Sequence, residues 1–560
     1  MKRFINLFLT ISILLLSLTG CGLEVSNDVV YSQDERMSES DALKELSSLL
    51  TKVDVTTVSN PTLDIYSDEV SAADTLADIS TYPLVVETRA DIVIEIAAAT
   101  EMSSSSPDDW IVVVANNFNK QKFKVNGKTI GVNIRKITSG EVVTYVLNGD
   151  YKPNVFIPSN EAWGLMLESS GIDITKIEDR IAGNTAGILM AKDTYNSFID
   201  KYKDATVANV LTAANNGDLL FAYTNPFTSS TGLNVLTAML KSFDENDPLS
   251  SKASQALLDY QKNSPPVAYT TAVLVNQASK GIIDCMVMEE QAYINKPELK
   301  DYVYFPVGIR HDHPVYTFGW NDSDMNDAAK MFTEFCLNDD SQRLASERGF
   351  NLHDDYKAQD PGLTGIGYIS AQSLWKQNKN GGKPIIAVFI CDCSGSMKGE
   401  PINTLKTSLI NSSTYIGQDN YIGLISYSDD VTINLPIKQF DAKQRAYFSG
   451  EVKSLIGSGG TATYDALLVG VNLIEEAMKE VPDATPIIFL LTDGDRNQGY
   501  NYNRIEPIIG GLRIPVFPIA YNYSSTKELD NLATLNEATT IKADTDDIVN
   551  QLRNLFNVQM

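Results

Sequence analysis

The sequence has few cysteines, few histidines and too few basic residues to balance its acidic ones. Its 560 residues include five cysteines and three histidines, and 45 lysines and arginines stand against 71 aspartates and glutamates, giving a formal net charge of −26. A surface this acidic repels nucleic-acid phosphates and anionic lipid headgroups, so we expect neither as an electrostatic partner. The length allows two to four ordinary domains with full cores.

The scarcity of cysteine excludes a disulfide framework, because only four cysteines follow the N-terminal region. Cys391 and Cys393 are separated by one residue and are too close to bridge without strain, so we expect both to be small core or loop residues. No histidine or third cysteine lies near them in the sequence, which argues against a soft-metal site. A bond between Cys285 and Cys336 stays possible.

The scarcity of histidine argues against an enzyme. Three histidines form no convincing Ser–His–Asp or Cys–His arrangement, and no glycine-rich nucleotide motif is present. The segment His311–His313 has a proline directly after it and no evident third metal ligand, so we expect a solvated loop there. The pair Glu289–Glu290 is interpreted as a surface pair.

Long apolar runs are absent after the N-terminus. Lys2 and Arg3 precede the mostly apolar run Phe4–Leu18, which is shorter than a membrane span. The run ends in Leu-Thr-Gly-Cys at Cys21, which resembles a bacterial lipobox; an ordinary secretory signal with a chance cysteine is the alternative. The resemblance implies cleavage before Cys21 and a diacylglycerol on its sulfur. We therefore expect a signal peptide at residues 1–20 and a protein on the extracytoplasmic face of the bacterial cell membrane, attached by lipid alone.

The rest of the chain divides by composition. Residues 21–83 are polar and acidic, and we expect a lipid-anchored stalk there, with a short amphipathic helix at 38–50. Residues 84–355 show an α/β pattern, residues 356–382 are interpreted as a linker containing glycine and asparagine, and residues 383–560 form a second α/β domain. The elements expected in the first domain are strands at 91–97, 142–147, 187–191 and 219–224, a serine-rich loop at 100–109, and helices at 110–119, 236–243 and 327–348.

The order of these pieces carries a resemblance. A helix VVVANNFN, then TNPFTSSTGL, DHPVYTFGW and AAKMFTEFCLNDDSQRLASERGF, resembles an extracellular solute-binding protein of the type II periplasmic class over roughly residues 85–355. The resemblance implies two α/β lobes with a ligand cleft between them, and hydroxyls at helix N-termini that hold a small polar or anionic solute. The residues matching that role are Thr228, Ser229 and Ser230, with Ser103 and Ser104 opposite them. Plain helix capping and a solvated loop are the alternative.

The C-terminal third opens with a buried strand and a polar loop. Residues 384–390 form a continuous apolar run, which is typical of a strand covered on both faces in a parallel sheet. The run leads into Asp392, Ser394 and Ser396, and a tight turn at Gly395 can direct their three oxygens toward one point. Ligands of open α/β sheets bind beyond the carboxyl ends of the strands, which is where this loop lies.

Two further motifs belong to that edge. A Gly-Gly-Thr segment supplies Thr461, and a second apolar strand ends in Thr-Asp-Gly with Asp493. Alone, Asp392 and Ser394 could merely cap a helix. Together the three motifs resemble the metal-ion-dependent adhesion site of von Willebrand factor type A domains, which have a Rossmann-like, doubly wound fold. The resemblance implies that the metal ligands are Asp392, Ser394, Ser396, Thr461 and Asp493.

The residue types suit the chemistry that this resemblance implies. Oxygen ligands with several neutral hydroxyls favour a hard cation such as Mg²⁺, with Mn²⁺ or Ca²⁺ as alternatives. Two carboxylates leave such an ion under-neutralised, so an acidic side chain of a protein partner can complete its coordination. We therefore expect a surface lipoprotein that binds a protein through a cation and holds or senses a solute. A substrate-binding lipoprotein of an ABC-type importer, with the second domain as an accessory, is the alternative.

Overall fold

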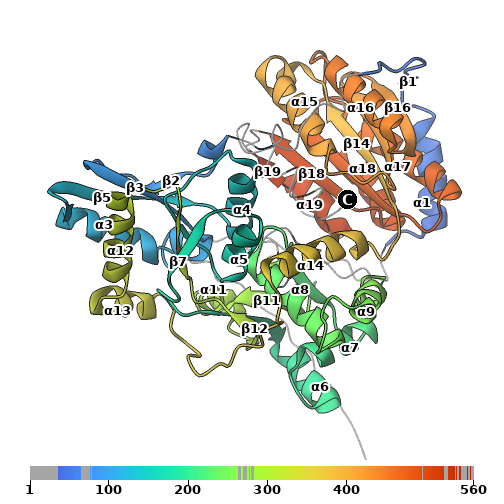
Figure 1. Cartoon of the computed structure of the whole chain (residues 1–560). Helices are drawn as coiled ribbons and strands as arrows, with labels where there is room; N and C mark the ends of the chain where they lie inside the picture. The colour runs from blue at the N-terminus through green and yellow to red at the C-terminus, as the bar shows by residue number, and fades with distance from the viewer. Residues whose placement is uncertain are drawn as a thin grey trace, which may run out of the picture.

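The computed structural model describes residues 36–64, 76, 78–262, 267–268, 274–275, 278, 283–494, 496–521, 527–536, 538, 541–543, 552, 555 and 560. Cys21 and the expected signal peptide lie outside these residues. The described chain is α/β and contains three sheets, two before residue 320 and one that lies mainly after residue 384 (Figure 1). The expected α/β class is confirmed.

The first two sheets form two lobes. In lobe one the strand order is β2-β5-β3-β6-β13-β7, and in lobe two it is β10-β9-β11-β8-β12. The chain crosses between the lobes twice, after β7 and after β12. The strands of lobe one are β2 (Leu84–Val86), β3 (Ile92–Ala98), β4 (Lys124–Val125), β5 (Lys128–Lys136), β6 (Val155–Ile157), β7 (Ile174–Glu178) and β13 (Val315–Phe318). Those of lobe two are β8 (Thr185–Ala191), β9 (Phe221–Thr224), β10 (Val267–Ala268), β11 (Cys285–Glu289) and β12 (Tyr302–Arg310).

Helices cover both lobes. In lobe one, α3 buries Trp110 and Phe118 against the sheet, and in lobe two α8 is buried over most of its length. The helices of lobe one are α2 (Thr100–Ser103), α3 (Trp110–Gln121), α4 (Ser139–Asn148), α5 (Ala162–Ser169), α12 (Ser323–Cys336) and α13 (Asp339–Glu347). Those of lobe two are α6 (Lys192–Tyr202), α7 (Val207–Asn215), α8 (Ser230–Phe243), α9 (Ser251–Gln261) and α11 (Glu290–Ile294).

Three expectations for lobe one are wrong. Residues 100–109, expected as a loop, begin with the short helix α2. Residues 142–147, expected as a strand, lie in the helix α4, whose apolar side chains are buried on several sides and so hide the helical period. Residues 327–348, expected as one helix, belong to α12 and α13. The break occurs at Asn338, whose side chain accepts a hydrogen bond from the N–H of Ser341 and so starts a new helix.

The C-terminal domain is a single sheet with helices on both faces. Its strand order is β1-β16-β15-β14-β17-β18-β19. The five neighbouring strands β15, β14, β17, β18 and β19 are parallel to one another, and β16 is antiparallel to β15. The strands are β1 (Val55–Thr57), β14 (Ile385–Asp392), β15 (Tyr421–Tyr427), β16 (Val431–Gln439), β17 (Thr485–Thr492), β18 (Val516–Tyr521) and β19 (Ile541–Ala543). The helices are α15 (Glu400–Ser413), α16 (Ala442–Ser454), α17 (Thr463–Glu480), α18 (Tyr502–Leu512) and α19 (Lys527–Leu535).

The strand β14 lies in the middle of this sheet, and all eight of its residues are buried. Alternate side chains point to opposite faces: Phe389 packs in one core and Val388 and Ile390 in the other. This two-sided burial is why the strand reads as an uninterrupted apolar run.

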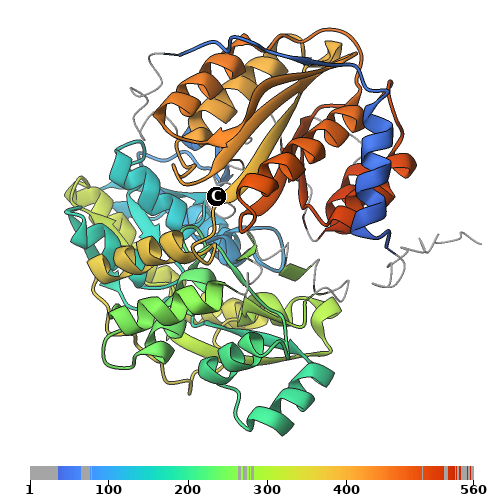
Figure 2. The ribbon, with the colours of Figure 1, turned by 90° about the vertical axis from the view of Figure 1, so that its right-hand side faces the viewer.

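We expected a stalk at residues 21–83, but the described residues 36–64 are part of the C-terminal domain, and Ile79 accepts a hydrogen bond from Arg135 of lobe one. The helix α1 (Glu39–Leu50) begins at Ser38, whose hydroxyl accepts from the N–H of Asp41, and it buries Leu46 and Leu49 in the core beneath α17 and α18. The strand β1 then pairs in parallel with β16. Figure 2 shows this segment beside the C-terminal helices and along the edge of their sheet. The two lobes are therefore inserted between the first strand of this sheet and the rest of it.

The segment 356–382 is likewise not a simple linker. It contains the helix α14 (Gly365–Asn378), which packs on α5 of lobe one and on α8 and α9 of lobe two. Tyr368 joins a core of lobe one, whereas Trp375 is fully buried in the core of lobe two and donates from Nε1 to the hydroxyl of Tyr223 at 2.8 Å. This helix therefore touches both lobes just before the chain enters β14 (Figure 1).

Candidate functional site

The centre of the candidate site is Asp392, the last residue of β14, whose side chain has no solvent exposure. Its Oδ1 accepts from the N–H of Ser394 at 2.8 Å, and its Oδ2 accepts from the hydroxyls of Thr492 at 2.8 Å and Tyr427 at 3.2 Å. Burial raises the pKa of Asp392, although the hydrogen bonds from Ser394 and Thr492 act in the opposite direction. The carboxyl group is therefore fixed in orientation by the loop after β14 and by the two neighbouring strands, β15 and β17.

The serines of the same loop connect Asp392 to the next strand. The hydroxyl oxygens of Ser394 and Ser396 lie 2.9 Å apart, and Ser396 donates to Oδ1 of Asp493 at 2.8 Å. Asp493 follows β17 directly, and its pKa is raised by burial. The structure therefore brings together four of the five residues that the motifs predicted as metal ligands.

Thr461, the fifth predicted ligand, lies in a loop held against the first one. The N–H of Gly395 donates to the carbonyl of Gly459 at 3.0 Å, and Ser458 N–H donates to the carbonyl of Cys393 at 2.7 Å. The backbone of Thr461 is fixed by Asn497, whose side-chain oxygen accepts its N–H at 2.8 Å. These contacts place the three loops at one edge of the sheet.

The donor set of this edge consists of oxygens, two of them carboxylates. Among the residues that the structure describes, no group of three or more histidine, cysteine, aspartate or glutamate side chains could hold a metal ion. Any cation at this edge would therefore depend on the hydroxyls of the serines and Thr461. Hydroxyls with two carboxylates fit a hard divalent ion and do not fit a soft one.

Three residues of this edge escaped the sequence reasoning as contributors. Thr492 belongs to the Thr-Asp-Gly motif, so its position could have indicated a role. Tyr427 lies directly opposite Asp392 in the paired strands, a register that the sequence does not reveal. Asn497 lies four residues beyond Asp493, in a loop without a recognisable pattern.

The hydroxyls predicted to bind a solute are used inside the protein. Ser103 donates to the carbonyls of Ala98 and Ala99 at 3.2 and 2.8 Å, and Ser104 donates to that of Thr100 at 2.6 Å. The hydroxyl of Ser229 accepts from the N–H of Gly232 at 3.2 Å, and so caps α8, and it lies 2.7 Å from the hydroxyl of Thr224. Helix capping, the alternative reading, accounts for the bond of Ser229, whereas Ser103 and Ser104 donate to backbone carbonyls of the preceding turn.

The remaining two predicted solute residues lie where the lobes touch. Ser230 of lobe two accepts from Nε1 of Trp163 in lobe one at 2.8 Å. A side chain at Gly140 of lobe one would come within 2.0 Å of the carbonyl oxygen of Phe227 and 2.8 Å of Cα of Thr228. The lobes therefore approach closely at this point, and Gly140 is what permits it.

The His311–His313 segment is not the solvated loop that we expected. Both histidines are fully buried at the second crossing between the lobes. Nδ1 of His311 lies 2.5 Å from a carboxylate oxygen of Glu289, and Nε2 of His313 lies 3.1 Å from one of Glu101. Glu289 and Glu290 are also buried, so their interpretation as a surface pair is wrong.

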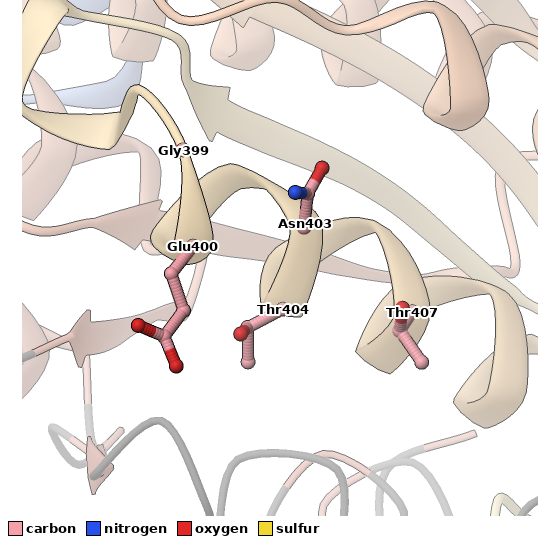
Figure 3. Close-up of a pocket in the computed structure, with 5 residues that line it drawn as sticks. All are labelled: Gly399, Glu400, Asn403, Thr404 and Thr407. Atoms are coloured by element: carbon pink, nitrogen blue, oxygen red, sulfur yellow. The ribbon is translucent and has the colours of Figure 1, made fainter.

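A separate hollow of about 540 Å³ lies on the C-terminal domain, where α15 begins. It is lined by Gly399, Glu400, Asn403, Thr404 and Thr407, all in or directly before one helix (Figure 3). The side chains of Glu400 and Thr404 point to one side and that of Asn403 points to the other. No predicted site residue lines this hollow.

Two protein families match successive parts of the chain. The family of bacterial extracellular solute-binding proteins matches residues 100–351, and the von Willebrand factor type A domain matches residues 387–557. The inter-alpha-trypsin inhibitor heavy chain H3 of Bos taurus is 31% identical over 171 residues, which are 28% of this chain and 19% of that protein. An uncharacterized protein of Synechocystis, sll0103, is 30% identical over 118 residues, covering 21% of this chain and 27% of the relative. The chain thus spans only about a fifth of the first of these relatives.

Solved structures resemble the same two parts. A von Willebrand factor type A protein from Catenulispora acidiphila has 21% identity and a TM-score of 0.29, covering 31% of this chain and 42% of that one. Iron-bound HitA from Pseudomonas aeruginosa has 14% identity and a TM-score of 0.37, covering 52% of this chain and 99% of that one. At these identities the likeness concerns the fold alone.

Proposed function

We propose that this chain, a bacterial extracellular solute-binding domain followed by a von Willebrand factor type A domain, binds a protein partner through a divalent cation. Asp392, Ser394, Ser396, Thr461 and Asp493 would hold the ion, directly or through water. The observation that carries the proposal is the hydrogen-bonded series Ser394–Ser396–Asp493, which joins two of the three motif loops. Both domains are of kinds that typically bind rather than catalyse.

The chemistry of the site favours an acidic partner. A bound Mg²⁺ or similar ion would supply a positive charge and an open coordination position, and a carboxylate is the ligand that such an ion attracts. The protein's own residues supply orientation: Thr492 and Tyr427 direct the carboxylate of Asp392, and Asn497 holds the backbone of Thr461. With only two carboxylates in the donor set, a third from the partner strengthens the site.

The proposed location is the extracytoplasmic face of the membrane, with Cys21 as the lipidated residue. None of the described helices is long and apolar enough to cross a membrane. The first described helix, α1, packs on the C-terminal domain and begins after Ser38, 17 positions beyond Cys21. A tether of this length extends at most about 60 Å, so the lipid would hold the cation-binding domain near the membrane surface.

The two lobes are proposed to hold or sense a small polar solute. Trp163 and Ser230 meet across the lobes, and α14 touches both lobes before the chain enters β14, so a solute that alters the lobe contact would also act on α14. Thr231 donates to the carboxylate of Glu289 at 3.0 Å, and the same carboxylate lies 2.5 Å from Nδ1 of His311. These bonds link the first turn of α8 to the second crossing between the lobes, and the solute is proposed to be polar or anionic.

Delivery of a solute to an importer is the second candidate function, supported by the match of residues 100–351. The two functions differ in what the cation should do. If the protein delivers solute to an importer and the C-terminal domain is an accessory, solute uptake should persist after Asp493→Ala. If the protein recognises a partner through the metal ion, capture of that partner should be lost in the same variant. Transporter membrane-subunit genes beside this one would also favour the importer.

The decisive experiment is calorimetric titration of Mg²⁺ into residues 22–560, because the segment before residue 64 completes the C-terminal sheet. Wild-type protein should bind one ion, and Asp493→Ala should lose it. Asp483→Ala is a matched control, since this exposed aspartate precedes β17 at the opposite edge of the same sheet. Pull-down from cell envelopes with and without EDTA then tests the partner. Undiminished Mg²⁺ binding in Asp493→Ala would refute the site, and capture that is indifferent to EDTA would refute its role.

A further inference from the structure

A polar cavity of about 160 Å³ lies beside the proposed cation site. It is bounded by the end of β15, the start of β16, the end of α16 and the loop after β14. Cys393 belongs to its lining and lies between Asp392 and Ser394, so the cavity and the cation site share one loop. Asn434, Asp430, Ser426, Thr432 and Ile456 also line it.

Asn434 gives the cavity an unused hydrogen-bond acceptor. The residue is 6% exposed, and its Nδ2 donates to Oε2 of Glu451 at 3.2 Å. This bond fixes the side-chain amide, and Oδ1 at its other end is buried and has no hydrogen-bond partner among the residues that the structure describes. Buried polar atoms are rarely left unpaired in native proteins, so Oδ1 is positioned for a donor that comes from a ligand.

The charged residue that lines the cavity, Asp430, and the buried carboxylate behind Asn434 are acidic, whereas Lys406 of α15 acts on Cys393 with the opposite sign. Glu451 is 3% exposed, and among the described residues the groups that donate to its carboxylate are neutral: the N–H of Thr62 at 2.7 Å and the amide of Asn434. Asp430 is exposed and lines the cavity as well. A buried carboxylate with neutral donors keeps its field, which attracts a cation and repels an anion.

We propose that this cavity receives an ammonium or guanidinium group, which donates to Oδ1 of Asn434 in the field of Glu451 and Asp430. The group could belong to a basic side chain of the partner or to a free amine. In the first case the partner presents a basic residue to the cavity and an acidic residue to the metal ion. This case rests on the proposed function. Ile456, 76% exposed on the cavity lining, would then contact the apolar stem of the basic side chain.

The thiol of Cys393 can serve as a probe of the cavity, but it is 6% exposed and burial raises its pKa, so its reactions at pH 8 are slow and are followed over hours. Methanethiosulfonates convert a thiol to a mixed disulfide with release of methanesulfinate, and the 2-aminoethyl and 2-sulfonatoethyl reagents differ in charge. We would measure their rates at Cys393 by the masses of peptide fragments, which separate it from Cys391 on the same peptide, in the full chain carrying Cys21→Ser. Both reagents meet the same thiol, so the ratio of their rates, normalised to the ratio at a small neutral thiol, reports the charge around Cys393, and the Asp430 and Asn434 variants assign it to the cavity.

We expect the normalised ratio to favour the cationic reagent at least tenfold. Asp430→Asn, a change at an exposed residue, should reduce this preference two- to threefold, and Asn434→Leu should reduce it further. Propylguanidinium should protect Cys393, whereas 1-butanol at the same concentration should not. Equal normalised rates, equal protection by butanol, or no reaction with any reagent would overturn the proposal.

Two additional arms distinguish the sources of the cation. Protection by a short peptide containing lysine and aspartate that is stronger in Mg²⁺ than in EDTA indicates a partner side chain. Protection by spermidine that ignores Mg²⁺ indicates a free amine. Asp493→Ala should abolish the Mg²⁺ effect and keep the preference for the cationic reagent, so failure of the cation site and failure of the cavity give different results.

Discussion

The hydroxyl of Ser396 donates to the carboxylate of Asp493 at 2.8 Å, although the two residues are 97 positions apart in the sequence. They meet because β14 and β17 are parallel neighbours, paired from Ile385 to Cys391, and the carboxyl ends of parallel neighbours reach the same edge of a sheet. Each loop therefore depends on the other for the geometry of the candidate site. Changes that leave both strands intact can still disable the site.

Thr492→Val should weaken cation binding without unfolding the domain. The threonine hydroxyl donates to Oδ2 of Asp392 at 2.8 Å, and valine has the same shape and suits a strand, but cannot donate. Groups that orient metal ligands typically contribute about ten- to hundredfold to metal affinity. Calorimetry with Mg²⁺ on residues 22–560 should show a loss of this size.

Cys393→Ser is the control for that prediction. The side chain of residue 393 occupies the slot between Asp392 and Ser394 and need not contribute a ligand, so Mg²⁺ affinity should stay within about twofold of wild type. If Thr492→Val instead binds Mg²⁺ as wild type does, the orientation of Asp392 does not matter to the ion and the site has been misassigned.

The sequence predicts those elements whose apolar pattern lies within a short stretch of the chain. The strands Ile385–Asp392 and Thr485–Thr492 are buried on both faces, so their apolar runs predict them directly, and the position of the motifs at their ends predicts the convergence of Asp392 and Asp493. The helix Ser139–Asn148 was misread because its apolar residues are buried on several sides and show no clean period.

The stalk and the linker were misread for a different reason: their partners are distant. Val55 pairs with Val431, and Trp375 bonds to Tyr223, 152 positions away. A polar segment that completes a remote sheet looks like a tether in composition, because all three residues of β1 are exposed and α1 buries one face only. His311 and Glu289 were misread in the same way, since each one is satisfied by the other in the interior.

Leu46→Ala should destabilise the C-terminal domain by about 2–5 kcal/mol, the usual range for deleting a buried leucine side chain. Leu46 is 2% exposed and packs in the core formed with α17 and α18. The four tryptophans lie at or before position 375, so their fluorescence does not report on this domain. Hydrogen exchange of the peptide covering residues 431–439, the partner of β1, should accelerate.

Leu63→Ala is the matched control, because Leu63 belongs to the same N-terminal segment and is 48% exposed. Its effect should stay within about 0.5 kcal/mol. Equal exchange rates in wild type and Leu46→Ala would show that the C-terminal domain is stable without α1, and would restore the interpretation of the segment as a tether.

Trp375→Phe should destabilise the two lobes by about 1–3 kcal/mol, because it leaves the buried hydroxyl of Tyr223 without one of its partners. Burial raises the pKa of Tyr223 to about 12, so this hydroxyl stays neutral throughout the test. Urea unfolding followed by fluorescence of the remaining tryptophans measures the loss. Ile366→Ala, at a 61% exposed position of the same helix, should change little, and a loss equal to that of Trp375→Phe would contradict a specific role for the tryptophan.

The pair His313–Glu101 should make the stability of the lobes depend on pH in a defined direction. Burial alone would lower the pKa of His313, but the hydrogen bond and charge of Glu101 outweigh it and raise this pKa above 6.5. Burial would raise the pKa of Glu101, yet His313 outweighs it and lowers this pKa below 4.5.

The two shifts act on stability in opposite pH ranges. A histidine with a raised pKa stabilises the fold below about pH 6.5, and this contribution is lost as pH rises through the pKa of the folded state. A carboxyl group with a lowered pKa stabilises the fold above about pH 4.5, and this contribution is lost as pH falls through the pKa of the folded state. The contribution of the pair is therefore greatest between these values. Urea unfolding at pH 5.5, 7 and 8.5 should show that the difference in unfolding free energy between wild type and the double variant His313→Gln/Glu101→Gln, which removes both coupled groups, shrinks as pH rises. Other titrating groups cancel in this difference, so a difference that is constant or grows with pH would show that His313 is not charged in the folded protein.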